Sequence, residues 1–433
     1  MIESRAIPKL LMREHTFEVP LDHQRPQGPQ IQVFAREVVD RERDQDSLPW
    51  MIFFQGGPGF GAPRPMDDRG WLKRVLKDYR VLLLDQRGTG RSTPVNMQML
   101  QRVGQTQDQF EFLCHFRADN IVRDAELIRS QLLKLNQRWT AFGQSYGGWC
   151  ITNYLSQAPQ GLDAAIFTGG LPPIHRTAEE VYRATYPVVE QKNHRHYQRY
   201  PEDEERIQRI AHHLEAHDVR LPLGDRLTLR RFQQLGLGFY RSSGYHTLHY
   251  LLENAFVDER SQDELNYAFL RAFEQQFAFD TNPIFAILHE SIYAQDSATN
   301  WAAHRVRTEF PQFDRGPNER ILLTGEMIYP WMFTDIAQLT PYHDLAQRLA
   351  EFEGWNQLYD LDVLRANNVP VAAIVYYEDM CVAREFSLET AQSIQGTRVW
   401  ITNEYEHNGI GVDGERILDR LIDMIHDDVH FAY

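Results

Sequence analysis

The stretch WTAFGQSYGG, residues 139–148, decides how this chain of 433 residues folds. Its first five residues are mostly apolar, which is typical of a strand buried on both faces of a sheet. The next residues fit G-x-S-x-G, and residues 149–157 are typical of a helix. The pentapeptide alone also fits an ordinary glycine turn, but the strand before it and the helix after it favour a sharp, strained turn that exposes a nucleophile. We therefore predict that Ser145 is a nucleophile.

Apolar runs around this stretch predict a sheet with helices between its strands. Residues 31–39, 50–54, 81–85 and 164–170 are typical of strands. Residues 120–135 carry apolar side chains at helical spacing. Strands that alternate with helices of this length indicate an α/β fold with a mostly parallel central sheet.

The strand pattern is interrupted in the middle of the chain. Strands are hard to find between residues 174 and 364, and two late runs, residues 369–377 and 397–402, restore the pattern. A helical insertion in one sheet explains this better than three consecutive domains. We therefore expect one core made of residues 1–173 and 365–433, here called the core, and an inserted helical cap domain, residues 174–364, here called the cap.

Composition and charge exclude several classes of protein. The chain has 45 Lys and Arg against 60 Asp and Glu, a net charge of −15, which argues against nucleic acid or an anionic membrane as a partner. The 3 cysteines fit neither a disulfide framework nor a zinc motif, so we expect no metal, no cofactor and a reducing, cytoplasmic location. The first residues lack the apolar run of a signal peptide. The sequence leaves open whether the chain forms a homo-oligomer.

A second motif, QGGPG at residues 55–59, follows the predicted strand 50–54. Such a glycine-rich loop can direct backbone N–H groups at a substrate oxygen that becomes negatively charged. We expect the N–H groups of Gly57 or Gly56, together with that of Tyr146, to form this oxyanion site. A phosphate-binding loop is the alternative, but the G-K-[ST] ending and the G-x-G-x-x-G spacing are both missing.

A nucleophilic serine also needs a base and an acid that orients the base. With a G-x-S-x-G turn the chain order is serine, then acid, then histidine. Glu378 and Asp379 follow the late run 369–377, and His407 follows the last predicted strand. We expect His407 to take the proton of Ser145, and Asp379 to fix the tautomer of His407. Glu378 is the alternative acid.

Several motifs taken together resemble the proline iminopeptidases, also called prolyl aminopeptidases, in the longer branch of that family. The motifs are QGGPG, GQSYGG, DQRGTGRS (85–92), HESIYA (289–294), GEMIYPWMF (325–333), YYEDMCV (376–382) and EYEHNG (405–410). The resemblance implies an α/β-hydrolase fold and a serine exopeptidase that releases N-terminal proline from peptides through an acyl-enzyme. It also implies a catalytic triad of Ser145, Asp379 and His407. Many members have Gly-Arg-Tyr-Asp where this chain has Tyr376-Tyr377-Glu378-Asp379.

The same resemblance implies how the substrate's amino end is recognised. The family uses acidic residues of the cap, and Glu290 and Glu326 stand in the matching motifs. A partly buried carboxylate distinguishes a free amine from a blocked one through a charge-assisted hydrogen bond. For each glutamate the alternative is a solvated charge on a helix face. For the whole chain, the alternative function is that of an esterase, amidase or lactonase on the same capped fold.

Overall fold

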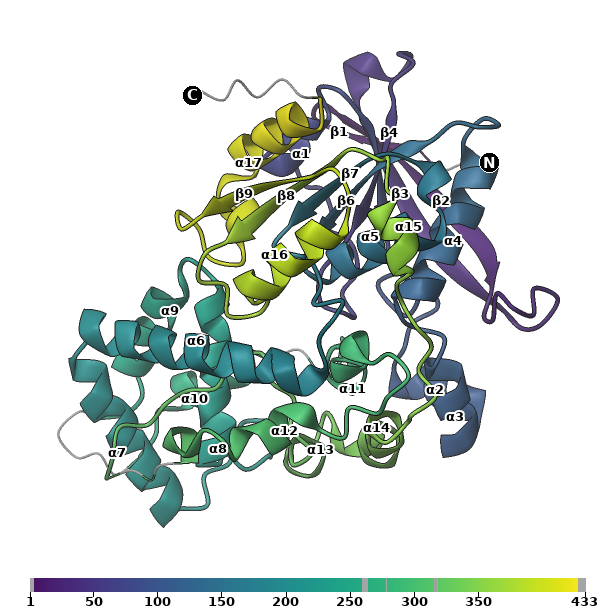
Figure 1. Cartoon of the computed structure of the whole chain (residues 1–433). Coiled ribbons are helices and arrows are strands. Elements are labelled where there is room, and N and C mark those ends of the chain that lie inside the picture. Colours follow the sequence, from purple (N-terminus) through teal and green to yellow (C-terminus); the bar gives the residue numbers. More distant parts are fainter. Residues whose placement is uncertain (1–3, 259–263, 278, 315, 317, 427–433) are drawn as a thin grey trace.

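A sheet of nine strands forms the centre of the computed structural model, which describes residues 4–258, 264–277, 279–314, 316 and 318–426 (Figure 1). The strand order across the sheet is β1-β2-β3-β5-β4-β6-β7-β8-β9. The strands are β1 (Ser4–Ile7), β2 (Leu10–Pro20), β3 (Gln30–Asp40), β4 (Trp50–Phe54), β5 (Arg80–Leu84), β6 (Trp139–Gln144), β7 (Leu162–Thr168), β8 (Val371–Tyr376) and β9 (Thr397–Thr402).

The sheet is antiparallel at one edge and parallel over the rest. β1, β2, β3 and β5 pair antiparallel with one another in that order, whereas β5, β4, β6, β7, β8 and β9 pair in parallel. The strands predicted from residues 31 onward are all present, within about two residues of the expected ends. β1 and β2 were not predicted from the sequence, because their polar and apolar residues do not form a continuous apolar run. The predicted mostly parallel sheet is confirmed.

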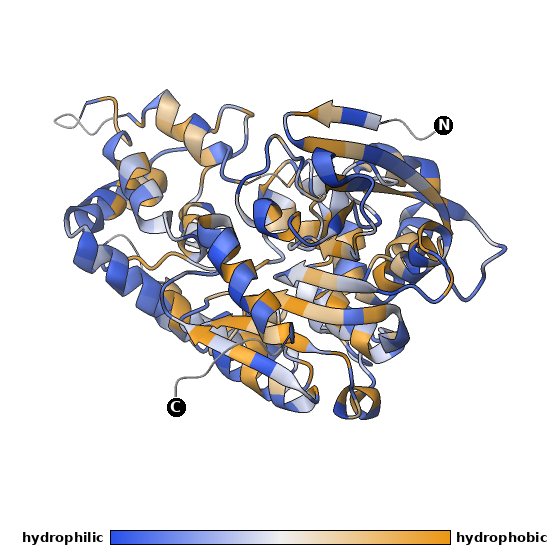
Figure 2. Ribbon diagram, turned by 90° about the horizontal axis from the view of Figure 1, so that it is seen from above, coloured by the Kyte–Doolittle hydropathy of each residue, from blue (hydrophilic) through white to orange (hydrophobic). Residues whose placement is uncertain are grey.

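Helices cover both faces of the sheet, which explains why its central strands are apolar on both sides. α1 and α17 share one hydrophobic cluster with one face, and α4 and α5 share another with the opposite face. Figure 2 shows hydrophobic residues gathered along the central strands. The core helices are α1 (Trp71–Val75), α2 (Met97–Val103), α3 (Thr106–Leu113), α4 (Ala118–Leu132), α5 (Tyr146–Gln157), α16 (Arg384–Ser393) and α17 (Gly409–His426).

The described residues of the cap fold mainly into helices that lie beneath the sheet in Figure 1. α15, at the end of the cap sequence, packs against α5 and α16 of the core. Of the helices that the structure describes, none is both long and apolar enough to span a membrane. The cap helices are α6 (Ala178–Arg199), α7 (Glu202–Ala216), α8 (Leu229–Phe232), α9 (Gly244–Glu253), α10 (Tyr267–Glu274), α11 (Ile284–Ile287), α12 (Ala302–Arg307), α13 (Met332–Asp335), α14 (His343–Ala350) and α15 (Leu361–Arg365).

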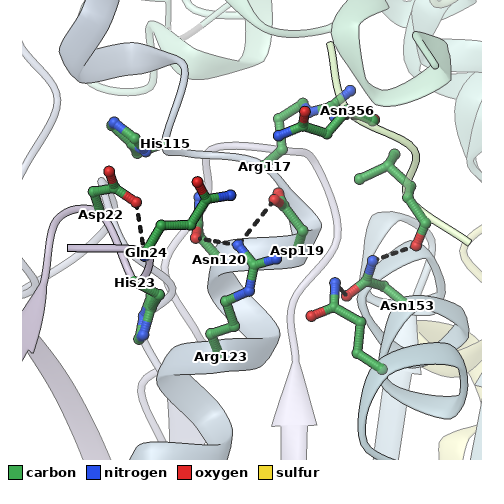
Figure 3. Close-up of polar contacts among 12 residues, drawn as sticks. Asp22, His23, Gln24, His115, Arg117, Asp119, Asn120, Arg123, Asn153 and Asn356 are labelled. Atoms are coloured by element: carbon green, nitrogen blue, oxygen red, sulfur yellow. Dashed lines mark hydrogen bonds and ion pairs between the residues drawn. The ribbon is translucent and has the colours of Figure 1, made fainter. Parts of the chain in front are cut away.

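A buried arginine joins the core to the cap at the start of α4 (Figure 3). The Arg117 guanidinium donates hydrogen bonds to the carbonyl oxygens of Ser291 at 3.1 Å, Ala294 at 2.6 Å and Asn356 at 2.7 Å. It also lies 4.5 Å from the ring centroid of Trp355. Because these contacts bind main-chain atoms of the cap, Arg117 fixes the cap backbone rather than one of its side chains.

Candidate active site

Ser145 lies on a strained turn between β6 and α5. Its backbone has φ 52° and ψ −122°, a conformation that residues other than glycine seldom adopt. The turn packs so closely on β4 that a Cβ atom at Gly147 would lie 2.1 Å from the carbonyl oxygen of Phe54. Glycine is therefore required at position 147, and the close packing holds Ser145 at the carboxyl end of the sheet.

His407 and Asp379 form a buried hydrogen-bonded pair. His407 Nδ1 lies 2.7 Å from Asp379 Oδ2, and the two residues are 4% and 3% exposed. The other oxygen of Asp379 accepts the backbone N–H groups of Cys381 at 2.8 Å and Val382 at 3.0 Å. With Nδ1 bound to the carboxylate, Nε2 is the nitrogen of His407 that is left to exchange a proton with a nucleophile.

The surroundings of His407 favour its protonated form. Burial by itself lowers the pKa of this imidazole, but the charge of Asp379 and the hydrogen bond to it more than compensate. The carboxylates of Glu326 and Glu406 act in the same direction, so the pKa of His407 lies above its usual value. An imidazolium formed by proton transfer is therefore stabilised.

Glu378, the alternative acid, points to a different partner. Its carboxylate forms an ion pair with both terminal nitrogens of Arg195 on α6. The hydrogen bond from Arg195 is the main reason why the pKa of Glu378 lies below its usual value. The structure thus brings Asp379, and not Glu378, to His407.

Ser145 and His407 line the same cavity, which has a volume of about 480 Å³ and lies between the core and the cap. The predicted residues Gly56, Gly57 and Glu326 line it as well. The remaining lining residues mix glutamine and aromatic side chains, so the cavity has both polar and apolar walls; they are Gln55, Phe60, Gln144, Gln234, Leu235, Leu237, Gly238, Tyr240, Arg241, Gln275, Gln276, Phe277, Phe279, Phe285 and Cys381. None of these additional wall residues was singled out from the sequence as a substrate contact.

The glycine-rich loop lies directly against the nucleophile turn. A Cβ atom at Gly56 would come within 3.0 Å of the Ser145 Cβ and 2.3 Å of the Gln144 side chain. Gly57 has φ +135°, in the region that favours glycine. Tyr146 is the first residue of α5, so its backbone N–H has no acceptor within the helix. Gly56 and Gly57 therefore line the cavity of Ser145, and Tyr146 directly follows Ser145 in the chain.

Asp85 fixes the segment that follows this loop, a role that was not predicted from the sequence. The fully buried Asp85 carboxylate accepts the backbone N–H groups of Ala62 at 2.9 Å and Arg91 at 2.8 Å. It also pairs with the Arg64 guanidinium at 2.8 and 2.5 Å. A carboxylate directly after a buried strand, at the start of DQRGTGRS, was the signal available in the sequence.

Glu326 brings a negative charge into the cavity. The residue is half-buried, and the thiol of Cys381 hydrogen-bonds to its carboxylate. Within the part of the chain that the structure describes, no Lys, Arg or His forms a salt bridge with Glu326. A carboxylate on the wall of a cavity and without a cationic partner can bind a cation of the substrate.

Glu290 has a different place from the one expected. It is 6% exposed, is absent from the cavity wall, and accepts the backbone N–H groups of Ala302 and Ala303, both at 2.9 Å. These donors belong to the first turn of α12, so Glu290 caps a helix. Burial raises the pKa of Glu290 to about 7, against the effect of the two N–H donors. Glu290, which was expected to bind the substrate's amino end, therefore does not stand on the wall of the cavity that Ser145 and Glu326 line.

Three side chains at this site have atoms of the kind that bind metal ions. The ligand atoms of Asp379, Cys381 and His407 lie within 4.8 Å of one another. However, burial raises the pKa of the Cys381 thiol well above its usual value, whereas a cysteine binds metal as a thiolate. Asp379 and His407 are already bound to each other. This arrangement suits proton transfer better than metal binding.

Known proteins share this architecture. The sequence model of a family described as alpha/beta hydrolase fold matches residues 49–413. A proline iminopeptidase from Aeromonas sobria is 50% identical over 95% of this chain and 96% of its own length. Another, from Aspergillus aculeatus, is 33% identical over 96% of this chain and 93% of its own. The chain therefore belongs to the alpha/beta hydrolases and, among them, to the proline iminopeptidase family. A solved proline iminopeptidase from Mycobacterium smegmatis aligns over 95% of this chain and 98% of its own with a TM-score of 0.45 and 13% identity.

Proposed function

We propose that this chain is a serine aminopeptidase that releases N-terminal proline from peptides, with Ser145 as nucleophile, His407 as base and Asp379 as the acid that orients it. The observation that carries the proposal is the Glu326 carboxylate, which faces the cavity of Ser145 and His407. The two relatives that match nearly the whole chain are named proline iminopeptidases, which supports the choice of substrate.

The mechanism follows from the positions of these groups. Ser145 Oγ attacks the carbonyl carbon of the first residue of the peptide while His407 Nε2 takes the hydroxyl proton. The backbone N–H groups of Tyr146 and of Gly57 or Gly56 stabilise the tetrahedral oxyanion. His407 then gives the proton to the leaving amine, and an acyl-enzyme remains. A water molecule that loses its proton to His407 attacks this ester and frees proline.

The cap selects the substrate in this proposal. Glu326 accepts a charge-assisted hydrogen bond from the protonated imino group of an N-terminal proline, which an acylated proline cannot donate. The aromatic wall residues, among them Phe60 and Tyr240, give the pyrrolidine ring an apolar surface. The cap, residues 174–364, thus acts as the specificity domain of an enzyme whose chemistry lies in the core.

The proposal extends to the surroundings of the enzyme. We propose a cytoplasmic location, since Cys114, Cys150 and Cys381 are free thiols, and a reducing compartment keeps thiols free. Peptides with a free N-terminal proline are the proposed partners. The net charge of −15 argues against a nucleic-acid partner.

Hydrolysis of proline anilide, alanine anilide and N-acetylproline anilide, measured side by side, tests this function. We expect proline anilide to be cleaved fastest and the acetylated compound to be cleaved at least about 100-fold more slowly, because it lacks the cation that binds Glu326. Equal rates on the free and acetylated compounds would contradict an aminopeptidase and favour the esterase or amidase alternative. Failure of a fluorophosphonate probe to label Ser145 would contradict any serine hydrolase.

A further inference from the structure

A second charged side chain, Arg241, stands on the cavity wall at the end of a 3₁₀ helix, η3 (Gln233–Tyr240). Its Nε donates a hydrogen bond to the Tyr240 hydroxyl at 2.7 Å, and its guanidinium lies 5.0 Å from the Tyr240 ring centroid. Over the described ranges of the chain, no Asp or Glu forms a salt bridge with Arg241. The side chain is exposed, so its terminal nitrogens are available to a ligand in the cavity.

The two neighbours of Arg241 in the chain hold it near His407: Tyr240 contacts His407 itself, and Ser242 contacts the next residue, Asn408. The Tyr240 ring meets the His407 ring edge to face, with 6.2 Å between the centroids. The backbone N–H and the hydroxyl of Ser242 both donate to Asn408 Oδ1, at 2.9 and 3.2 Å. Asn408 directly follows His407 in the chain. Arg241 therefore has a defined position on the side of the cavity that His407 occupies.

That side of the cavity receives the leaving group. In the proposed mechanism His407 protonates the departing amine, so the second residue of the peptide begins next to His407. An extended chain advances about 3.3–3.6 Å per residue. The separations of 6.2 Å from the His407 ring to the Tyr240 ring and of 5.0 Å from the Tyr240 ring to the Arg241 guanidinium put that guanidinium no more than 11.2 Å from the His407 ring. A leaving group of one or two residues spans such a distance once its hydrogen-bonding contacts with both side chains are included.

We propose that Arg241 binds the terminal carboxylate of the leaving group, so that the preferred substrates are proline dipeptides and tripeptides with a free carboxyl end. This inference rests on the proposed function. Glu326 and Arg241 place opposite charges on the wall of one cavity, and a short peptide carries the complementary charges at its two ends. A guanidinium binds a carboxylate through paired hydrogen bonds, which an amide or an aromatic leaving group cannot accept in the same way.

The test compares substrates that differ only in this charge. We would measure kcat/KM for Pro-Ala and Pro-Ala-Ala, for their C-terminal amides, and for proline anilide, with wild type, Arg241→Met and Arg241→Lys. Wild type should prefer the better of the two acids over its amide by about tenfold, a moderate value because Arg241 is exposed. Arg241→Met should reduce this preference to about twofold or less, and Arg241→Lys should retain part of it. The preference of wild type should also weaken at high salt.

Arg183→Met is the matched control, because Arg183 is an exposed arginine of the cap that pairs with Glu309. It should keep the wild-type preference for acids. Equal kcat/KM of wild type for acids and amides, or an equal loss on both in Arg241→Met, would overturn the role of Arg241. If wild type fails to cleave even proline anilide, the proposed function itself is wrong, so the two failures are distinguishable.

Discussion

The core and the cap bring their functional groups to the cavity in different ways. In the core, Ser145, Asp379 and His407 follow β6, β8 and β9. The parallel sheet therefore places all three residues beyond the carboxyl ends of its strands. In the cap, Glu326 and Arg241 lie on irregular segments whose positions depend on contacts far apart in sequence. Backbone topology therefore fixes the positions of Ser145, Asp379 and His407, whereas contacts between distant segments fix those of Glu326 and Arg241.

Two ion pairs connect the cap to the core beside Asp379 and His407. Lys192 and Arg195, one turn apart on α6, form ion pairs with Glu406 and Glu378, which precede His407 and Asp379 in the chain. Lys192 is 1% exposed, so its charge is balanced in a nearly dry environment. A displacement of α6 would therefore change the electrostatic environment of His407.

The largest effect should follow from a change in the core, Ser145→Ala. Removal of the nucleophile should lower kcat for proline anilide by roughly 10⁴-fold or more. The expected stability is close to that of wild type, and circular dichroism checks it. Residual activity within about tenfold of wild type would show that the nucleophile lies elsewhere.

The next largest effect should separate the two neighbouring acids. Asp379→Asn should lower kcat by about 10³- to 10⁴-fold, because an amide donates to Nδ1 and favours the wrong tautomer of His407. Glu378→Gln should cost less than about tenfold, since this residue contacts Arg195. The kcat values of both variants on proline anilide, from steady-state kinetics, show which acid orients His407. A greater loss in Glu378→Gln than in Asp379→Asn would reverse the assignment of the acid.

A smaller effect on activity is expected from a change in the ion pair between Lys192 of the cap and Glu406 of the core. Lys192→Met removes the cation that balances Glu406, so the carboxylates around His407 should raise the pKa of this imidazole further. The acid limb of the pH profile of kcat/KM should move up by about half to one pH unit. The double variant Lys192→Met/Glu406→Gln should restore the limb. A fall in activity without any movement of the limb would indicate a purely structural role.

The smallest effect on activity is expected at Glu290, whose variant should instead change stability. The pKa of Glu290 is raised from 4.5 to about 7 in the folded protein, so the folded state holds a proton that the unfolded state loses first. The stability that comes from this group is complete below about pH 4.5 and is lost as the pH rises through about 7. Glu290→Gln does not titrate.

Between pH 5 and 8 the free energy of unfolding of wild type should therefore fall, relative to Glu290→Gln, by on the order of 1–3 kcal/mol. Denaturant unfolding at several pH values measures this difference. The control is Glu309→Gln, an exposed glutamate of the cap, whose profile should run parallel to that of wild type. Parallel profiles for Glu290→Gln as well would show that Glu290 does not gain a proton on folding.

The core was predictable because its signals are local. Apolar runs identify the strands from β3 onward, and G-x-S-x-G with its neighbours identifies the turn at Ser145. The order of the last two strands then placed Asp379 and His407 close together, as the structure shows. The choice between Glu378 and Asp379 needed the structure, because adjacent residues differ only in the direction of their side chains.

The cap was less predictable for a physical reason. Glu290 and Glu326 look equivalent in sequence, yet the first turn of α12 takes up the carboxylate of Glu290 and leaves that of Glu326 to the cavity. Nothing in the spacing of Arg241 or Lys192 indicates their contacts with the region around His407. These contacts depend on how the cap helices pack, which periodicity alone does not determine.

In the proposed function the core carries out the chemistry and Glu326 selects the substrate. The most direct test is the ratio of kcat/KM for proline anilide to that for N-acetylproline anilide, in wild type, Glu326→Gln and Glu290→Gln. We predict that Glu326→Gln lowers this ratio by about 10- to 100-fold, mainly through the free substrate. Glu290→Gln should keep the ratio within about threefold of wild type. Equal losses on both substrates in Glu326→Gln, or a collapse of the ratio in Glu290→Gln alone, would contradict substrate selection by Glu326.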